Sequence, residues 1–235
     1  MTKVFIFPFA GGSSYSFLDY SKYFKNKCDC TLIDYPGHGK RIRESLLYDA
    51  ERLVSDLLDK YGAAFDGPSI FVGHSMGALI AYLLIHRLNL AKKSLPFHFV
   101  VCGRGAPSYQ SRVIERHKMS DENFLHSLLE LGGISQEVAS SQELLDFTLP
   151  IIRADFQVIE TYKHVSLKKL KIPITVLYGK EENMTEDDAL SWKNETVARV
   201  ETKCWSGNHF FVLDHVREIG ASILDLCGLN TVNQF

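Results

Sequence analysis

Cysteine is scarce in this sequence, and the few cysteines present form no recognised pattern. Five stand among 235 residues, an odd number spread from Cys28 to Cys227. Cys28 and Cys30 are spaced too closely for a usual zinc knuckle, and no histidine pair follows them. A chain of this length buries roughly three-quarters of its unfolded surface, so its core does not depend on disulfides. We therefore predict reduced thiols, no metal site and a cytoplasmic protein.

Excess charge and long apolar runs are missing as well. A net charge of −2 argues against nucleic acid as the main partner. No apolar run reaches the roughly 18 residues that a membrane span needs, and we expect no membrane association. Residues 1–8 form a short apolar run that ends in Pro8, which is typical of a first strand rather than a signal peptide. With no linker and no repeat, residues 1–235 are predicted to form a single domain.

The sequence does contain an alternation of short apolar runs and helical patterns. Helical spacing occurs at residues 46–65, 78–90 and 211–226. Alternating strands and helices predict an α/β fold, with a mostly parallel sheet covered by helices on both faces. The apolar, β-prone runs predict strands at residues 4–7, 31–33, 70–72, 97–102, 174–178 and 200–205.

One stretch interrupts this alternation. Residues 108–168 contain no strand-like run, only amphipathic helical patterns at 121–131 and 142–162. A helical insertion between two strands of a parallel sheet would lie over the strand ends, where open α/β sheets bind ligands. We therefore predict a helical lid over residues 108–168.

A serine between two glycines is the strongest chemical signal. Residues 73–77 read Gly-His-Ser-Met-Gly, with a β-prone run before them and a buried helical pattern after them. This pattern is typical of the nucleophile elbow of serine hydrolases, where the glycines permit a turn too tight for a Cβ. The turn would expose the Ser75 hydroxyl at a helix N-terminus, where partial positive charge favours an oxyanion. Ser75 is therefore the predicted nucleophile.

A nucleophilic serine needs a base, and the last predicted strand leads to one. His209 follows that strand in a glycine-containing loop, and the chain order of α/β-hydrolases is serine, acid, histidine. His74 adjoins Ser75, but its side chain must point away from the nucleophile across the elbow. We therefore predict that His209 is the base.

The carboxylate that orients the base is defined less sharply. An acidic cluster follows the strand at 174–178, and the usual arrangement puts the acid three residues past the glycine there, which selects Glu182. Glu181 is the first alternative, and Asp155 is a remote one. Asp187 and Asp188 are interpreted as caps of the following helix.

An oxyanion hole needs two backbone N–H groups. Met76, the residue after the nucleophile, would supply one of them. Residues 7–12, Phe-Pro-Phe-Ala-Gly-Gly, would supply the other, because paired glycines let the backbone fold in close and leave Ala10, or Phe9, to present its amide. The Gly-Gly pair is equally typical of a plain turn, and it lacks the order of a nucleotide-binding phosphate loop.

Set side by side, these segments resemble the type II thioesterases, stand-alone α/β-hydrolases that accompany nonribosomal peptide and polyketide synthases. The resemblance spans nearly the whole chain. The run at 149–156 is its most distinctive part, because ordinary esterases lack it. The matching segments are Pro-Phe-Ala-Gly-Gly at 8–12, Tyr-Pro-Gly-His-Gly at 35–39, the elbow at 73–77, Gly-Arg-Gly-Ala-Pro at 103–107, His-Lys-Met-Ser-Asp at 117–121, Leu-Gly-Gly at 131–133, Leu-Pro-Ile-Ile-Arg-Ala-Asp-Phe at 149–156 and Gly-Asn-His-Phe-Phe-Val-Leu at 207–213.

The sequence departs from the family pattern in two places. His38 replaces the usual arginine, and Glu182 stands where the family usually has aspartate. A shifted alignment would instead put Asn183 at the aspartate position. Arg153 and Asp155 match the family, and we interpret them as a contact that fixes the lid on the core rather than as catalytic groups.

The resemblance implies a serine thioesterase that hydrolyses acyl thioesters on the phosphopantetheine arm of acyl or peptidyl carrier proteins, and so clears stalled or misprimed synthases in antibiotic biosynthesis. It also implies a monomer without a cofactor of its own, since the substrate carries the phosphopantetheine. A general carboxylesterase or lipase, an acyltransferase on the same residues and an inactive binding module remain the alternatives.

Overall fold

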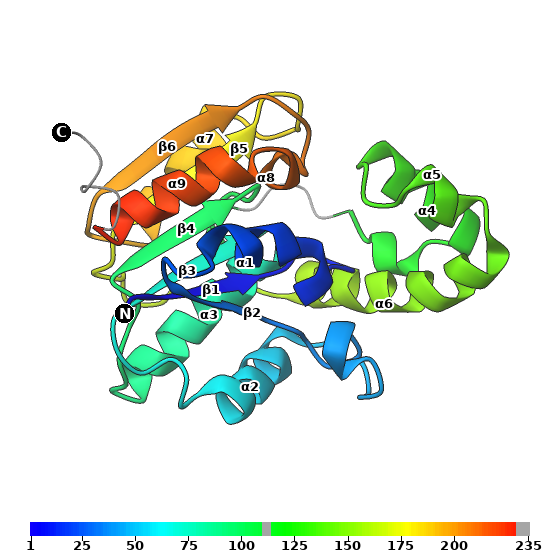
Figure 1. The fold of residues 1–235 in the computed structure, drawn as a ribbon. Coiled ribbons are helices and arrows are strands. Elements are labelled where there is room, and N and C mark those ends of the chain that lie inside the picture. The colour runs from blue at the N-terminus through cyan, green and yellow to red at the C-terminus, as the bar shows by residue number, and fades with distance from the viewer. Residues whose placement is uncertain (110–113, 229–235) are drawn as a thin grey trace.

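Six parallel strands form one sheet in the computed structural model, which describes residues 1–109 and 114–228. The strand order is β2-β1-β3-β4-β5-β6, and every neighbouring pair runs parallel. This sheet confirms the predicted α/β fold (Figure 1). The strands are β1 (Lys3–Phe7), β2 (Asp29–Leu32), β3 (Ser69–His74), β4 (His98–Cys102), β5 (Ile174–Gly179) and β6 (Val200–Trp205).

Helices follow the strands along the chain. Most of them pack directly on the sheet, and three lie in the long connection between β4 and β5. The α-helices are α1 (Leu18–Phe24), α2 (Ala50–Tyr61), α3 (Met76–Leu90), α4 (Asp121–Glu130), α5 (Gln136–Ala139), α6 (Gln142–Thr161), α7 (Glu186–Leu190), α8 (Phe211–Asp214) and α9 (Val216–Leu226). Short 3-10 helices are η1 (Ser14–Phe17), η2 (Gly39–Arg41), η3 (Arg116–Lys118) and η4 (Ser191–Asn194). None of the helices in these described parts is long and apolar enough to cross a membrane.

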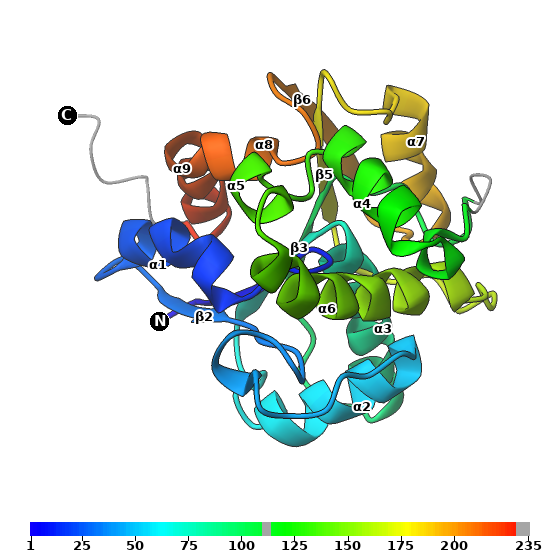
Figure 2. The same cartoon turned by 90° about the vertical axis from the view of Figure 1, so that its right-hand side faces the viewer.

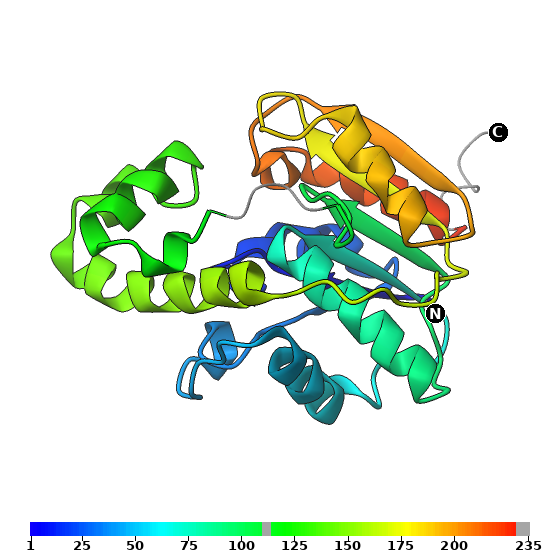
Figure 3. The same ribbon diagram turned by 180° about the vertical axis from the view of Figure 1, so that it is seen from behind.

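The two faces of the sheet bury separate apolar cores. Along β1, Phe5 and Phe7 join the core that contains residues of α2 and α3. Val4 and Ile6, which alternate with them, join the core that contains residues of α1 and α9. Figure 1 looks onto α1 and α9, and Figure 3 shows α3 and α7 on the opposite face. Burial on both faces explains why the central strands are continuously apolar.

Two predicted helices were wrong in their extent. The pattern at 46–65 gives only α2, because the Asp49 side chain accepts a hydrogen bond from the Arg52 N–H and caps the helix there. The pattern at 211–226 gives two helices, α8 and α9, which are divided at His215. The backbone of His215 is not helical, with φ −108° and ψ 37°, so the chain changes direction at this residue.

The predicted lid segment, residues 108–168, leaves the sheet after β4; its residues 110–113 lie outside the described residues. Helices α4, α5 and α6 (the lid helices) stand beyond the carboxyl ends of the strands (Figure 1), and in Figure 2 they lie in front of the sheet. The helical character of this segment agrees with the prediction. The lid helices share an apolar cluster of their own, formed by Phe124, Leu128, Leu145, Leu149 and Ile152.

The register of the sheet brings several loops to one edge. Phe7 pairs with Gly73, so the loop after β1 leaves the sheet beside the β3–α3 turn. Gly179 pairs with Trp205, so the loops after β5 and β6 also leave together. Because all strands are parallel, these loops gather at the carboxyl edge, where ligands bind in sheets of this type.

Candidate active site

Ser75 stands at the turn between β3 and α3, and its backbone is strained. Its φ of 54° and ψ of −112° lie outside the regions that residues with a side chain normally adopt. Such a conformation costs about 1–3 kcal/mol and persists only where its surroundings enforce it. The Ser75 N–H donates to the Cys102 carbonyl at 2.8 Å, which ties the turn to the end of β4. The residue therefore sits at the N-terminus of α3, as expected of a nucleophile elbow.

The glycines beside Ser75 are required by packing. A Cβ on Gly73 would lie 2.6 Å from the backbone of Ala78. A Cβ on Gly77 would overlap the carbonyl group of Phe7 on the neighbouring strand. Neither neighbour is a flexible side chain that could move away. These close approaches agree with the prediction of a turn too tight for a Cβ.

The loops after β5 and β6 bring Glu182 to His209. Glu182 Oε2 lies 2.7 Å from His209 Nδ1, and Glu182 Oε1 accepts a hydrogen bond from the Gly179 N–H at 2.6 Å. A carboxylate only accepts, so Nδ1 carries the proton and Nε2 keeps its lone pair. Glu182, and not Glu181, is thus in contact with the predicted base. A base held in this tautomer can accept a proton from a hydroxyl.

Gly179 makes that approach possible. A Cβ at this position would lie 2.5 Å from the carbonyl oxygen of Asn208, the residue just before His209. The Glu181 N–H also donates to the Gly207 carbonyl at 3.0 Å. The end of β5 and the histidine loop are therefore joined through their backbones.

The His74 side chain packs against the His209 ring and contacts the His209 backbone. Its ring is buried, its Nε2 lies 2.8 Å from the His209 carbonyl oxygen, and the two ring centroids are 4.9 Å apart. Burial, together with the neighbouring His209 ring, lowers the pKa of His74 well below its usual range. The neutral ring donates from Nε2 to that carbonyl. The sequence indicated only that His74 points away from Ser75, and it gave no sign of this positioning contact.

The loop after β1 carries the predicted oxyanion-hole residue Ala10. The Gly12 N–H donates to the Phe9 carbonyl at 2.9 Å, and Gly11 has a φ of 77°, a value that glycine adopts easily. Ala10 and Ser75 line the same pocket. Met76 is the first residue of α3, so its N–H is one of the unsatisfied donors of a helix N-terminus. Met76 is thus next to Ser75 in the chain, and Ala10 shares the pocket with Ser75.

The family model described as a thioesterase domain matches residues 2–227. The chain belongs to the thioesterase family. Among curated relatives, the gramicidin S biosynthesis protein GrsT of Aneurinibacillus migulanus is 29% identical over 218 residues, covering 92% of this thioesterase and 85% of GrsT. Thioesterase PikA5 of Streptomyces venezuelae is 29% identical over 221 residues, covering 93% and 78%.

Solved structures show the same relationship. The type II thioesterase BorB from the borrelidin biosynthetic cluster superposes with a TM-score of 0.87 at 32% identity, covering 95% of this thioesterase and 91% of BorB. The thioesterase RedJ from the prodiginine pathway of Streptomyces coelicolor superposes with a TM-score of 0.85 at 26% identity, covering 94% and 85%. The resemblance inferred from the sequence is therefore confirmed.

In this thioesterase, Asp155 joins the lid to the loop after β1. Asp155 Oδ2 accepts a hydrogen bond from the Gly11 N–H at 2.7 Å and lies 2.9 Å from His38 Nε2. Asp155 and His38 are both buried. The other ring nitrogen of His38 lies 3.0 Å from the Pro36 carbonyl. The interpretation that Asp155 fixes the lid on the core agrees with these contacts.

Arg153 does not share that role. Its guanidinium donates to the carbonyls of His117 and Met119, at 2.9 and 2.8 Å, and to Asp121 at 2.5 Å. All three partners lie in the lid segment. Arg153 therefore holds lid residues to each other, and the interpretation that it fixes the lid on the core was wrong. The sequence could not separate the two roles, because both residues lie on α6 only two positions apart.

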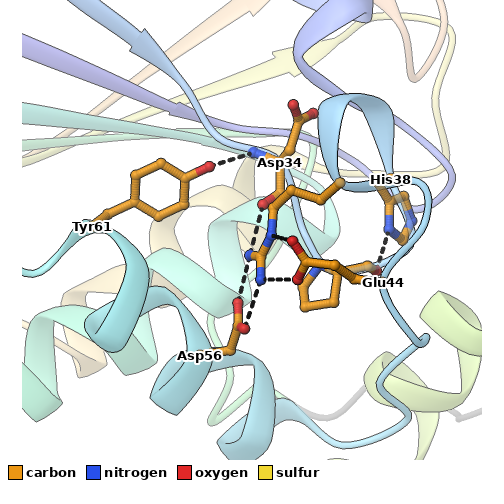
Figure 4. A network of polar contacts seen from close by, with 7 residues as sticks. Asp34, His38, Glu44, Asp56 and Tyr61 are labelled. Atoms are coloured by element: carbon orange, nitrogen blue, oxygen red, sulfur yellow. Dashed lines mark hydrogen bonds and ion pairs between the residues drawn. The ribbon is translucent and has the colours of Figure 1, made fainter.

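The loop that carries His38 is itself held by a polar network (Figure 4). Arg41 donates to both oxygens of Asp56, at 2.6 and 2.7 Å, and to both oxygens of Glu44, at 3.0 and 2.5 Å. Asp34 accepts from the Ser14 N–H at 2.7 Å. These contacts fix the backbone on both sides of His38. The loop therefore holds the His38 ring within hydrogen-bonding distance of Asp155.

A pocket of about 490 Å³ connects the site residues to the lid. Ser75, His209 and Glu182 all line it. Its apolar wall comes from the lid helices, with Ile152 and Phe156 on α6 as examples. Within the described parts of this thioesterase, no group of His, Cys, Asp and Glu side chains is arranged to hold a metal ion.

Proposed function

We propose that this thioesterase hydrolyses acyl groups from the phosphopantetheine arm of carrier proteins and so removes stalled or misprimed groups from synthases. The observation that carries the proposal is the pocket, which joins Ser75 and the His209–Glu182 pair to an apolar wall of lid helices. The names of the relatives support the pathway, since GrsT belongs to gramicidin S biosynthesis and BorB is a type II thioesterase. Residues 108–168 would act as the lid of a single-domain monomer.

In the proposed mechanism the arm enters beneath the lid with its thioester carbonyl beside Ser75. Ser75 Oγ attacks the carbonyl carbon while His209 Nε2 accepts the hydroxyl proton. Glu182 stabilises the imidazolium through Nδ1. The N–H groups of Met76 and Ala10 stabilise the oxyanion of the tetrahedral intermediate.

Collapse of this intermediate breaks the C–S bond. His209 returns its proton to the leaving sulfur, which departs as the free pantetheine thiol and leaves an acyl ester on Ser75. Water, activated by the same histidine, then attacks the ester and releases the carboxylic acid. The enzyme supplies every group that this sequence of steps requires, and the substrate brings the phosphopantetheine.

The test is release of free thiol from an acyl-loaded carrier protein. It is run beside the matching acyl-coenzyme A and a p-nitrophenyl ester, with Ser75→Ala as the control. We expect Ser75-dependent turnover that is much faster on the carrier than on either small substrate. Ester hydrolysis without a carrier preference would point to a general esterase. If the folded protein hydrolyses none of the three substrates, a binding module or an acyltransferase that lacks its acceptor would be favoured.

A further inference from the structure

Arg104 lies in the wall of the pocket, and the residue before it, Gly103, lies against the His209 ring. A Cβ on Gly103 would lie 3.0 Å from His209 Cε1, and Arg104 is the next residue. The Arg104 carbonyl accepts a hydrogen bond from Trp192 Nε1 at 2.8 Å, which fixes the backbone at this point. The Arg104 side chain lines the same pocket as Ser75. Arg104 thus stands on a fixed backbone in the wall of the pocket where substrate would bind.

The charge of this guanidinium is not balanced by an ion pair within the described parts of the chain. Its Nε atom is buried without a hydrogen-bond partner, and Arg104 forms no ion pair among residues 1–109 and 114–228. Burial lowers the pKa of Arg104 to about 10, so the side chain stays charged at neutral pH. A buried unpaired charge is unfavourable and marks a functional site more often than a structural one.

Among the described residues, none of the carboxylates that line the pocket forms an ion pair with Arg104, and three of them contact other groups. Glu160 Oε2 lies 2.6 Å from His117 Nδ1, and Asp188 Oδ2 accepts from the Thr185 N–H at 2.7 Å. Glu182 is engaged by His209. None of them neutralises Arg104. The Arg104 guanidinium is therefore available to a bound anion.

A second unpartnered nitrogen lies in the same wall. His164 follows α6 and lines the pocket, and its Nδ1 atom is buried without a hydrogen-bond partner. Tyr162 also lines the pocket and lies near Arg104. We call Arg104, Tyr162 and His164 the Arg104 wall. It joins the segment after β4 to the end of the lid.

We propose that the Arg104 wall binds a carboxylate on the acyl group of the substrate, so that the pocket selects half-thioesters of dicarboxylic acids. The inference rests on the proposed function. Arg104 is the main contact, because its planar guanidinium matches a carboxylate with two parallel hydrogen bonds. The phosphate of the arm is the other anion available. The whole pantetheine chain separates this phosphate from the thioester, whereas Arg104 directly follows Gly103, which lies against His209. The acyl carboxylate is therefore the favoured ligand.

The experiment measures free thiol release from N-acetylcysteamine thioesters, which carry no phosphate. Malonyl, succinyl and glutaryl thioesters are each compared with their methyl esters, which keep the shape and lose the charge. We expect the wild type to prefer at least one free acid over its ester. Arg104→Met should lower kcat/KM on that acid about 10- to 100-fold and leave the ester within about twofold. Arg104→Lys should recover part of the loss.

Arg116→Met is the matched control. Arg116 also lines the pocket and also has a buried Nε without a partner, but its guanidinium lies over the Phe156 ring. We expect this variant to keep the ratio of acid to ester. Thermal unfolding of Arg104→Met should show an unchanged or higher Tm, because an apolar side chain of similar volume replaces an unpaired buried charge.

Three results would overturn the proposal. Equal losses on acid and ester would make Arg104 a packing residue. No preference for any free acid in the wild type would remove the anion site. With the matching coenzyme A thioesters measured beside the N-acetylcysteamine thioesters, a loss confined to the coenzyme A substrates, whatever the acyl group, would assign Arg104 to the phosphate. In each case Ser75-dependent hydrolysis of the methyl esters would leave the proposed function standing, and its absence in folded protein would reject that function first.

Discussion

Asp155 on the lid helix α6 accepts a hydrogen bond from the backbone N–H of Gly11 at 2.7 Å. Gly11 directly follows Ala10, whose amide is the proposed oxyanion donor. The lid therefore contacts the proposed oxyanion loop through a carboxylate. Replacing Asp155 or Gly11 should lower kcat more than it changes KM.

The first prediction concerns Asp155→Ala. We expect kcat on a small thioester to fall about 10- to 100-fold with KM little changed, because a misplaced oxyanion donor weakens binding of the transition state alone. Steady-state kinetics and a Tm measurement would test it. Asp121→Ala is the control, since it removes a lid carboxylate that contacts Arg153 instead. An unchanged kcat in Asp155→Ala would contradict the prediction.

The second prediction concerns pH. Burial by itself lowers the pKa of His38, but the hydrogen bond and charge of Asp155, with help from Asp34, outweigh it and leave the pKa raised. A raised pKa stabilises the folded protein fully below the ordinary value of His, about 6.5. That stability is lost as pH rises through the raised pKa. The Tm difference between the wild type and His38→Gln should therefore shrink as pH increases. A Tm difference that grows with pH would contradict a raised pKa for His38.

The third prediction separates the candidate acids. Ser75→Ala and His209→Ala should each lower turnover on the order of 10⁶-fold, and Glu182→Ala nearer 10⁴-fold, because the acid only orients the base and stabilises its charged form. Glu181→Gln should stay within about twofold of the wild type. Single-turnover measurements of thiol release would resolve these differences. A larger loss in Glu181→Gln than in Glu182→Ala would exchange their roles.

The fourth prediction tests the elbow. Gly77→Ala should destabilise the protein by about 3 kcal/mol or more, because the new methyl group meets the rigid backbone of β1. Gly133→Ala is the control, since the nearest atom to its Cβ would be 3.6 Å away. Urea denaturation followed by circular dichroism would measure both. Similar midpoints for the two variants would show that the elbow can relax.

The fold could be predicted because the central strands are buried on both faces, so that their apolar runs stand out. Helix boundaries could not, where one side chain decided them. Asp49 caps α2, so the helix begins after this residue although the apolar pattern starts earlier. The non-helical backbone of His215 divides the last predicted helix into α8 and α9. Periodicity records which face of a helix is apolar, and it does not record such local events.

The candidate site was predictable to the extent that it lies in order along the chain. Ser75, Glu182 and His209 each follow a strand, and parallel strands bring such positions together. The contact of Asp155 with His38 joins residues 117 positions apart. The missing partner of Arg104 depends on where every nearby acid points. Neither feature has a local pattern, so each became visible only in three dimensions.

The close packing of α6 on the loop after β1 has a consequence for the timing of catalysis. Ile152 lies where a Cβ on Gly11 would be only 2.6 Å away, and Asp155 bonds that same glycine. A movement of α6 that opened the pocket would withdraw both contacts together and release the amide of Ala10. An enzyme with its lid raised would then be inactive, and hydrolysis would begin only after the lid had closed over a bound thioester.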